Sequence, residues 1–142
     1  MAEPEIAVML RGGETEGGFV RYAPGDAVRG EVQIVAQNDL NGRHLYVRLQ
    51  WHTEGRGDRD EGKIAEIDIL QGRLSKGIPQ VFLFQFRLPQ APWSYAGQYI
   101  TIVWEIAVVI DVSFMSSRTH SQPFIMAPRR GPLVPPAVSA LP

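Results

Sequence analysis

The chain has no cysteine among its 142 residues. This absence excludes a disulfide framework, a zinc–thiolate site and a thiol nucleophile. A cysteine-free chain suits a reducing compartment, and the N-terminal sequence MAEPEIAVML is acidic where a signal peptide is basic. We therefore expect a cytoplasmic protein.

The chain also lacks an excess of charge of either sign, because 14 basic residues face 15 acidic ones and the formal net charge is -1. Such a balance gives the molecule as a whole no attraction to nucleic acid or to an anionic membrane. The longest apolar run, residues 99–115, is shorter than the roughly 20 apolar residues that cross a bilayer, and Glu105 and Asp111 interrupt it. We expect neither a nucleic-acid partner nor a membrane span.

Helical periodicity is missing as well, because no stretch of about ten residues repeats its apolar positions every three or four residues. Apolar and polar side chains instead alternate in residues 28–34, 45–51 and 82–88, which is the pattern of half-buried strands. About seven or eight such segments, separated by polar and glycine-rich turns, predict an all-β fold. We expect an immunoglobulin-like antiparallel β-sandwich of two sheets.

The two ends of the chain differ in character. Residues 128–142 contain five prolines and show no apolar periodicity. We expect residues 1–127 to form one folded domain and residues 128–142 to form a proline-rich tail.

A rigid connector, LPQAPWSYAGQY at residues 88–99, separates an aromatic strand from the longest apolar run. Pro89 and Pro92 end the preceding strand, because proline removes a backbone donor and fixes the chain direction. We expect Trp93 and Tyr95 to cap one end of the sandwich.

Two segments together are similar to signature segments of the arrestin family. In the first, RYAPGDAVRGEVQI at residues 21–34, an aromatic residue precedes Pro-Gly-Asp and a strand with a central glycine. In the second, residues 84–112, an aromatic strand, Leu-Pro and a Ser-aromatic-x-Gly turn precede a long strand that carries an aromatic residue and ends near an acid. The matching residues are Tyr22, Pro24, Gly25, Asp26, Gly30, Phe86, Leu88, Pro89, Pro92, Ser94, Tyr95, Gly97, Trp104 and Asp111.

The resemblance covers Ile6 to Met126 and corresponds to the first of the two β-sandwich halves of an arrestin-like protein. It implies an arrestin-like sandwich with a binding or scaffolding role. The chain is too short for the second sandwich and for the polar core between the halves. Some family members recruit ubiquitin ligases through Pro-Pro-x-Tyr, whereas the tail has PPAV at residues 135–138. Receptor desensitisation and ligase recruitment are therefore not implied.

Histidines offer a first candidate for chemistry. His44 and His52 share one face of a predicted strand, but eight residues along a strand separate them by roughly 27 Å, so they cannot bind one ion together. We expect both to be exposed to solvent. His120 reaches either of them only through a strand pairing that the sequence does not specify.

Acidic residues offer a second candidate. Glu105 and Asp111 are six residues apart on a strand, about 20 Å, whereas a glycosidase pair needs roughly 5 to 10 Å. We expect them on an outward face or near a sheet end. The segment GRGDRD, residues 55–60, lacks the third glycine of a dinucleotide fingerprint. It predicts a hairpin tip, in which Asp58, Asp60 and Glu61 could at most bind a cation weakly.

The sequence contains neither a Gly-x-Ser-x-Gly elbow nor a phosphate-binding loop. We therefore expect no enzymatic activity, no catalytic residue, no cofactor and no metal.

The long predicted strand has apolar residues on both faces. Val103, Ala107 and Val109 are out of phase with the alternating set Ile100, Ile102, Trp104, Ile106, Val108 and Ile110. Either the tail or loops of this chain cover the second face, or the face is an interface with a partner. We expect self-association through that sheet face or through an open edge strand.

The function that we expect is that of a non-catalytic protein-binding or scaffold module with an unidentified protein partner. The alternative is a small-ligand or carbohydrate-binding sandwich that assists an enzyme, and a third class is an enzyme with residues converging from loops. Exposed Trp or Tyr around a concave sheet would favour the second class, and a buried acid or histidine in a closed pocket the third. A flat apolar face or an unpaired edge would favour protein binding.

Overall fold

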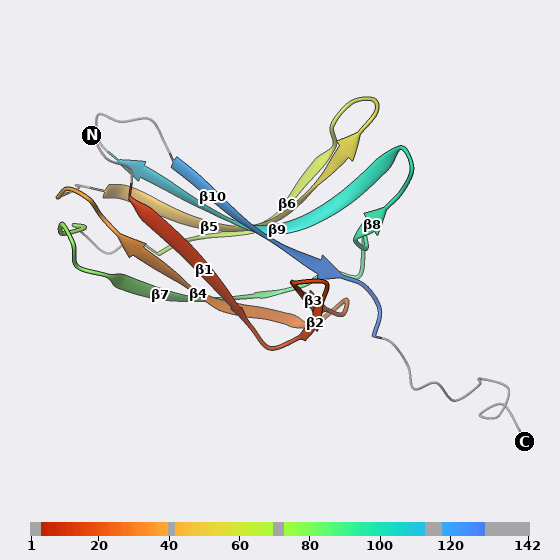
Figure 1. Ribbon diagram of the computed structural model, residues 1–142, viewed down its shortest axis with the longest axis horizontal. Helices are drawn as coiled ribbons and strands as arrows, with labels where there is room; N and C mark the ends of the chain where they lie inside the picture. The colour runs from red at the N-terminus through yellow and green to blue at the C-terminus, as the bar shows by residue number, and fades with distance from the viewer. Residues whose placement is uncertain (1–3, 40–41, 70–72, 113–117, 130–142) are drawn as a thin grey trace, which may run out of the picture.

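The computed structural model describes residues 4–39, 42–69, 73–112 and 118–129, which form strands and connections without a helix (Figure 1). These residues therefore contain no helix that could cross a membrane. The strands are β1 (Glu5–Arg11), β2 (Glu14–Glu16), β3 (Phe19–Tyr22), β4 (Ala27–Val35), β5 (Gly42–Gly55), β6 (Glu61–Asp68), β7 (Gln80–Arg87), β8 (Tyr95–Ala96), β9 (Ile100–Val112) and β10 (Arg118–Met126).

The described residues form ten strands where the sequence predicts seven or eight. The difference is due to β2, β3 and β8, which have three, four and two residues. Strands this short hold too few residues to show an alternating pattern. The predicted architecture, an all-β sandwich of two sheets, is confirmed. One ladder differs from the predicted antiparallel pairing, because β3 pairs with β10 in parallel.

The two sheets face each other across the core (Figure 1). The small sheet has the order β1-β4-β7, and both of its ladders are antiparallel. The large sheet has the order β2-β3-β10-β9-β5-β6, with β8 added to β9. Its two longest strands, β5 and β9, pair with each other and project beyond the small sheet at one end (Figure 1).

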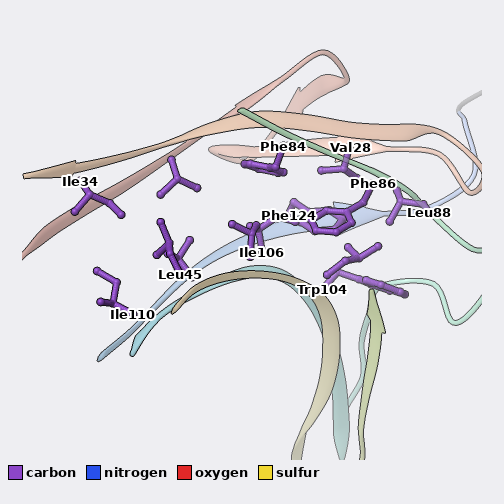
Figure 2. Packing of buried hydrophobic residues seen from close by; sticks show 14 of the residues in the cluster. Val28, Ile34, Leu45, Phe84, Phe86, Leu88, Trp104, Ile106, Ile110 and Phe124 are labelled. Carbon is purple, nitrogen blue, oxygen red and sulfur yellow. The ribbon is translucent and has the colours of Figure 1, made fainter. Parts of the chain in front are cut away.

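The core lies between the alternating faces of the two sheets, as the sequence pattern predicts (Figure 2). The small sheet contributes Val28, Ile34, Phe84 and Phe86, and the large sheet contributes aliphatic residues and Trp104, which has no exposed surface. Ile106, Val108 and Ile110 are buried as predicted, whereas Ile100 is 44% exposed. Ile100 differs because β9 begins in the part of the large sheet that no small-sheet strand covers (Figure 1).

Gly30 is the central glycine of the first signature segment, and the packing of β4 requires it. A Cβ atom at this position would lie 2.4 Å from the carbonyl oxygen of Met9 and 2.8 Å from the ring of Phe84. These neighbours belong to β1 and β7, so only glycine lets three strands approach at this point.

The Tyr-Ala-Pro-Gly-Asp segment forms a turn that ties β3 to β4. The side chain of Asp26 accepts a hydrogen bond of 3.0 Å from the backbone N–H of Ala23, and Gly25 has a positive φ of 82° that favours glycine. Tyr22 is buried and donates a hydrogen bond of 2.7 Å to the carbonyl of Arg11. Burial raises the pKa of Tyr22 to about 12. The hydroxyl of Tyr22 therefore stays protonated at neutral pH and can donate this hydrogen bond.

The connector between β7 and β9 closes one end of the sandwich through its backbone. The indole N–H of Trp104 donates a hydrogen bond of 2.7 Å to the carbonyl of Pro92. Ser94 exchanges hydrogen bonds with the backbone of Met126. The prediction that Trp93 and Tyr95 cap this end is wrong, because these rings are 52% and 59% exposed. Trp104 closes the end from inside instead.

The start of the predicted tail contacts the folded strands. The carbonyl of Pro128 accepts a hydrogen bond from Arg21, and Arg129 forms an ion pair of 3.1 Å with Asp26. Residues 130–142, which include the PPAV sequence, lie outside the described residues.

Candidate interaction surfaces

The outer face of the large sheet is bent, and the bend explains which residues it buries. Figure 2 shows β5 and β9 turning away from the small sheet near Trp104, so their outer face is concave. The ladder between β5 and β6 shifts register between Leu49 and Gln50, and an irregularity of this kind increases bending and twist. Side chains on the concave face are brought together and shield one another from water.

His52 corrects the expectation of exposed histidines, because it is buried in this concavity. Its Nδ1 lies 3.0 Å from a carboxylate oxygen of Glu105, and its Nε2 lies 2.7 Å from a carboxylate oxygen of Glu54. Gln50 donates a further hydrogen bond of 3.0 Å to Glu105. Glu105 lies on the outward face as predicted, but it is buried there by these partners.

The other candidate histidines are held in separate places. His44 is partly exposed, stacks on Tyr46 and lies 2.6 Å from a carboxylate oxygen of Asp68. His120 pairs with Val108 of β9, so it lies on the inner face of the large sheet, opposite to the face of His44 and His52. The described residues contain no group of three or more residues placed to hold a metal ion.

The two predicted acids also remain apart. Glu105 lies opposite Gln50 of β5, whereas Asp111 lies opposite His44. The segment 55–60 forms the tip of the hairpin between β5 and β6, and its residues are exposed, as predicted. The backbone N–H of Asp60 donates a hydrogen bond of 2.8 Å to the hydroxyl of Thr53, which closes this hairpin.

The second face of the long strand is partly covered in this chain. Ala107 and Val109 are buried on it, where they lie opposite Arg48 and Tyr46 of β5. Val103 is half-buried and lines a groove. The groove lies near Phe124 and Ile125, where the pairing of β10 with β9 ends and its pairing with β3 begins. The groove has a volume of about 410 Å³, and its apolar lining includes Phe19, Tyr95, Ile102, Val103, Pro123 and Ile125.

The free edge of β7 is a candidate interaction surface that contains no catalytic motif. Among the described residues β7 pairs only with β4, so its second edge has no strand partner. Between Gln80 and Phe86 the strand carries no charge. The sequence did hold a signal, since an uncharged alternating run between Pro79 and Pro89 is typical of an edge strand.

Comparison with known proteins supports the fold. No family model and no curated protein matches the sequence. Among solved structures, Spo0M, a sporulation control protein from Bacillus subtilis, matches with a TM-score of 0.69 and 15% identity. The match covers 91% of this chain and 51% of that one, so the chain spans about half the length of Spo0M. The chain has an arrestin-like β-sandwich fold, as the two signature segments predict.

Proposed function

We propose that the protein is a non-catalytic protein-binding module that accepts an extended polypeptide segment as an additional strand on the edge of β7. The observation that carries this proposal is the combination of an unpartnered edge, among the described residues, with the absence of charge from Gln80 to Phe86. Adding a strand to an open sheet edge is a general mode of peptide recognition.

The direction of the backbone groups on β7 follows from one hydrogen bond. The N–H of Leu88 donates to the carbonyl of Asp26 at 2.8 Å, so the pair of these residues is a hydrogen-bonded one. Hydrogen-bonded and non-hydrogen-bonded pairs alternate along an antiparallel ladder. The backbone groups of Phe82, Phe84 and Phe86 therefore point to β4, and those of the residues between them point to the free edge.

The side chains of β7 divide in the same alternating way. Phe84 and Phe86 are buried in the core and fix the strand in place. Val81 and Leu83 lie on the outer face and are 54% and 73% exposed. A fixed strand with exposed apolar side chains is prepared to bind, because little order is lost when a partner joins it.

This geometry selects a class of partner. A row of alternating donors and acceptors, repeated roughly every 7 Å along the edge, matches the backbone of another extended chain. Val81 and Leu83 favour apolar side chains on the outer face of that chain. The partner is thus a polypeptide segment with alternating apolar residues and little charge, because no charge on β7 before Arg87 would compensate one.

Two further properties belong to this proposal. The buried titratable pair, His52 and Glu105, is hydrogen-bonded internally and lines no part of the apolar groove, which supports a role without catalysis. The absence of cysteine supports a cytoplasmic location. We also propose residues 1–127 as the binding domain and residues 128–142 as an appended tail.

One observation favours a second candidate, the binding of a small ligand or carbohydrate. Trp93, Tyr95 and Tyr99 are each more than half exposed, and Tyr95 lines the apolar groove. Arg56 lies over the ring of Tyr99 at 5.3 Å, so this ring already has a cationic neighbour. Exposed rings beside a groove offer stacking surfaces to a sugar.

Selection of peptides from a random display library tests the proposed function. Binders are selected on the wild-type protein, and their affinities are measured by fluorescence anisotropy with Leu83→Lys and Met9→Lys. Met9 is the matched control, because it is 57% exposed on the same outer face but belongs to β1 at the opposite edge.

We expect alternating apolar peptides whose binding Leu83→Lys weakens at least tenfold and Met9→Lys leaves unchanged. Peptides that bind equally well to both variants would contradict the β7 site. Oligosaccharide binding that is lost with Tyr95→Ala would instead support the second candidate.

A further inference from the structure

We propose that a second copy of this chain occupies the β7 edge, with the two β7 strands antiparallel about a two-fold axis through Phe84. The two small sheets would then form one continuous sheet across the dimer. This inference rests on the proposed function, because it names the partner of the same edge.

The backbone of β7 is complementary to itself. Val81, Leu83, Gln85 and Arg87 direct their N–H and C=O groups to the free edge, as the ladder with β4 requires. In an antiparallel pair, each of these residues exchanges both hydrogen bonds with an outward-directed residue of the partner. A two-fold axis satisfies both strands at once, because the two edges are identical.

The prolines at either end of β7 select the register. Pro79 and Pro89 lack an N–H and are equally far from Phe84 in the sequence. Centring the axis on Phe84 places Leu83 opposite the partner's Gln85, and Val81 opposite the partner's Arg87. Moving the axis by one residue would bring one of the prolines opposite an outward-directed residue and lose hydrogen bonds.

The side chains agree with this register. On the inner face, Phe84 meets the partner's Phe84, and Phe82, which is only partly buried in one chain, meets the partner's Phe86. Aromatic pairs directly opposite each other stabilise a sheet. On the outer face, the pairing covers Leu83, which is 73% exposed in the single chain.

Charge favours the antiparallel arrangement over a parallel one. Arg87 is the sole charged residue of β7 and lies at its end. In the antiparallel pair the two Arg87 side chains lie at opposite ends of the interface, whereas a parallel pair would place them side by side. A second copy therefore meets the low-charge requirement of this edge along its whole length.

Sedimentation velocity over a range of concentrations tests the dimer, with wild type, Leu83→Lys and Met9→Lys compared. We expect a wild-type dimer whose dissociation constant rises at least 100-fold in Leu83→Lys and is unchanged in Met9→Lys. Both sites are exposed, so we expect both variants to fold, and circular dichroism checks this. Wild type that remains a monomer at about 1 mM, or a dimer that Leu83→Lys does not weaken, overturns the inference.

Disulfide cross-linking tests the register, and the cysteine-free chain supplies a clean background. Residues of a hydrogen-bonded pair lie about 5.5 Å apart between Cα atoms, within disulfide range. Mixing Leu83→Cys with Gln85→Cys under mild oxidation should give mainly the mixed dimer. Equal or faster cross-linking of either variant with itself would overturn this register.

The two proposals fail in distinguishable ways. A monomer that binds selected peptides through β7 overturns the dimer and leaves the proposed function intact. A dimer that is insensitive to β7 substitutions, in a protein whose peptides are equally insensitive, overturns both.

Discussion

β6 lies at one edge of the large sheet and β7 at one edge of the small sheet. Both strands have eight residues, but they differ in charge. β6 carries Glu61, Lys63, Glu66 and Asp68, whereas β7 carries only Arg87 at its end. Proteins protect open edges with charges and with irregularities in the ladder, and β6 has both. β6 therefore has the features of a protected edge, whereas β7, the proposed binding edge, lacks charge from Gln80 to Phe86.

The protection of β6 is visible in its contacts. Glu66 accepts a hydrogen bond from Arg48 of β5 and lies 3.5 Å from Lys63 of its own strand. The ladder shifts register between Leu49 and Gln50, opposite the middle of β6. A chain approaching β6 would have to displace these charged groups, and no equivalent group exists between Gln80 and Phe86 on β7.

The largest expected effect separates the two faces of β7. Phe84→Ala removes a buried ring and should lower the free energy of unfolding by about 3 to 5 kcal/mol, because it leaves a cavity. In a sample dilute enough to be monomeric, Leu83→Ala, one residue along on the exposed face, should change it by less than about 0.5 kcal/mol. Urea denaturation measures both, and similar losses would show that the outer face of β7 also supports the fold.

An intermediate effect should follow when the protection of β6 is removed. The double variant Lys63→Val and Glu66→Val keeps the net charge but leaves residues 62–67 of β6 without charge, so assemblies larger than a dimer should form. We expect association at β6 to strengthen by at least tenfold, about 1.4 kcal/mol. Light scattering measures the assembly.

The matched control for this variant is Arg56→Val with Asp58→Val, which removes one basic and one acidic residue from the exposed hairpin tip. It should associate like the wild type. If both double variants aggregate equally, loss of surface charge in general is responsible, and the specific role of the β6 edge is wrong.

The smallest expected effect concerns the ion pair of β6. The hydrogen bond from Arg48 lowers the pKa of Glu66 below its ordinary value of 4.5. This interaction therefore stabilises the fold above about pH 4.5 and is lost as the pH falls through the lowered pKa. Glu66→Gln should cost less than about 1 kcal/mol at pH 7, because exposed ion pairs contribute little.

The pH dependence provides the check on this last variant. Urea denaturation at neutral pH and near pH 3 should show a difference between Glu66→Gln and wild type that shrinks on acidification. A difference that is unchanged at low pH would show that packing of the side chain, rather than its charge, is responsible.

Much of the sandwich follows from the sequence, because a strand with one buried face alternates with a period of two. Val28, Phe84 and Ile106 lie in the core where alternation places them. The Pro-Gly-Asp turn and Gly30 likewise act through local geometry, which neighbouring residues determine. These features belong to single strands and turns, so they can be predicted without knowledge of strand order.

The candidate surfaces depend on information that no single strand contains. His52 and Glu105 are buried because β5 and β9 bend together, and the ladder between β5 and β6 shifts register nearby, between Leu49 and Gln50. The free edge of β7 depends on which strands are neighbours in each sheet. Strand order is set by contacts between distant parts of the chain, so alternation could suggest an open edge without identifying it.

Residue-resolved amide hydrogen exchange on β7 tests most directly whether this edge is the binding element. In a dilute sample without peptide, the N–H groups of Val81, Leu83 and Gln85 should exchange rapidly, while those of Phe82 and Phe84 are protected by β4. With a selected peptide bound, or at concentrations where the chain associates, we expect the outward-directed amides to become protected. Unchanged rapid exchange of these amides in the bound state would contradict the account.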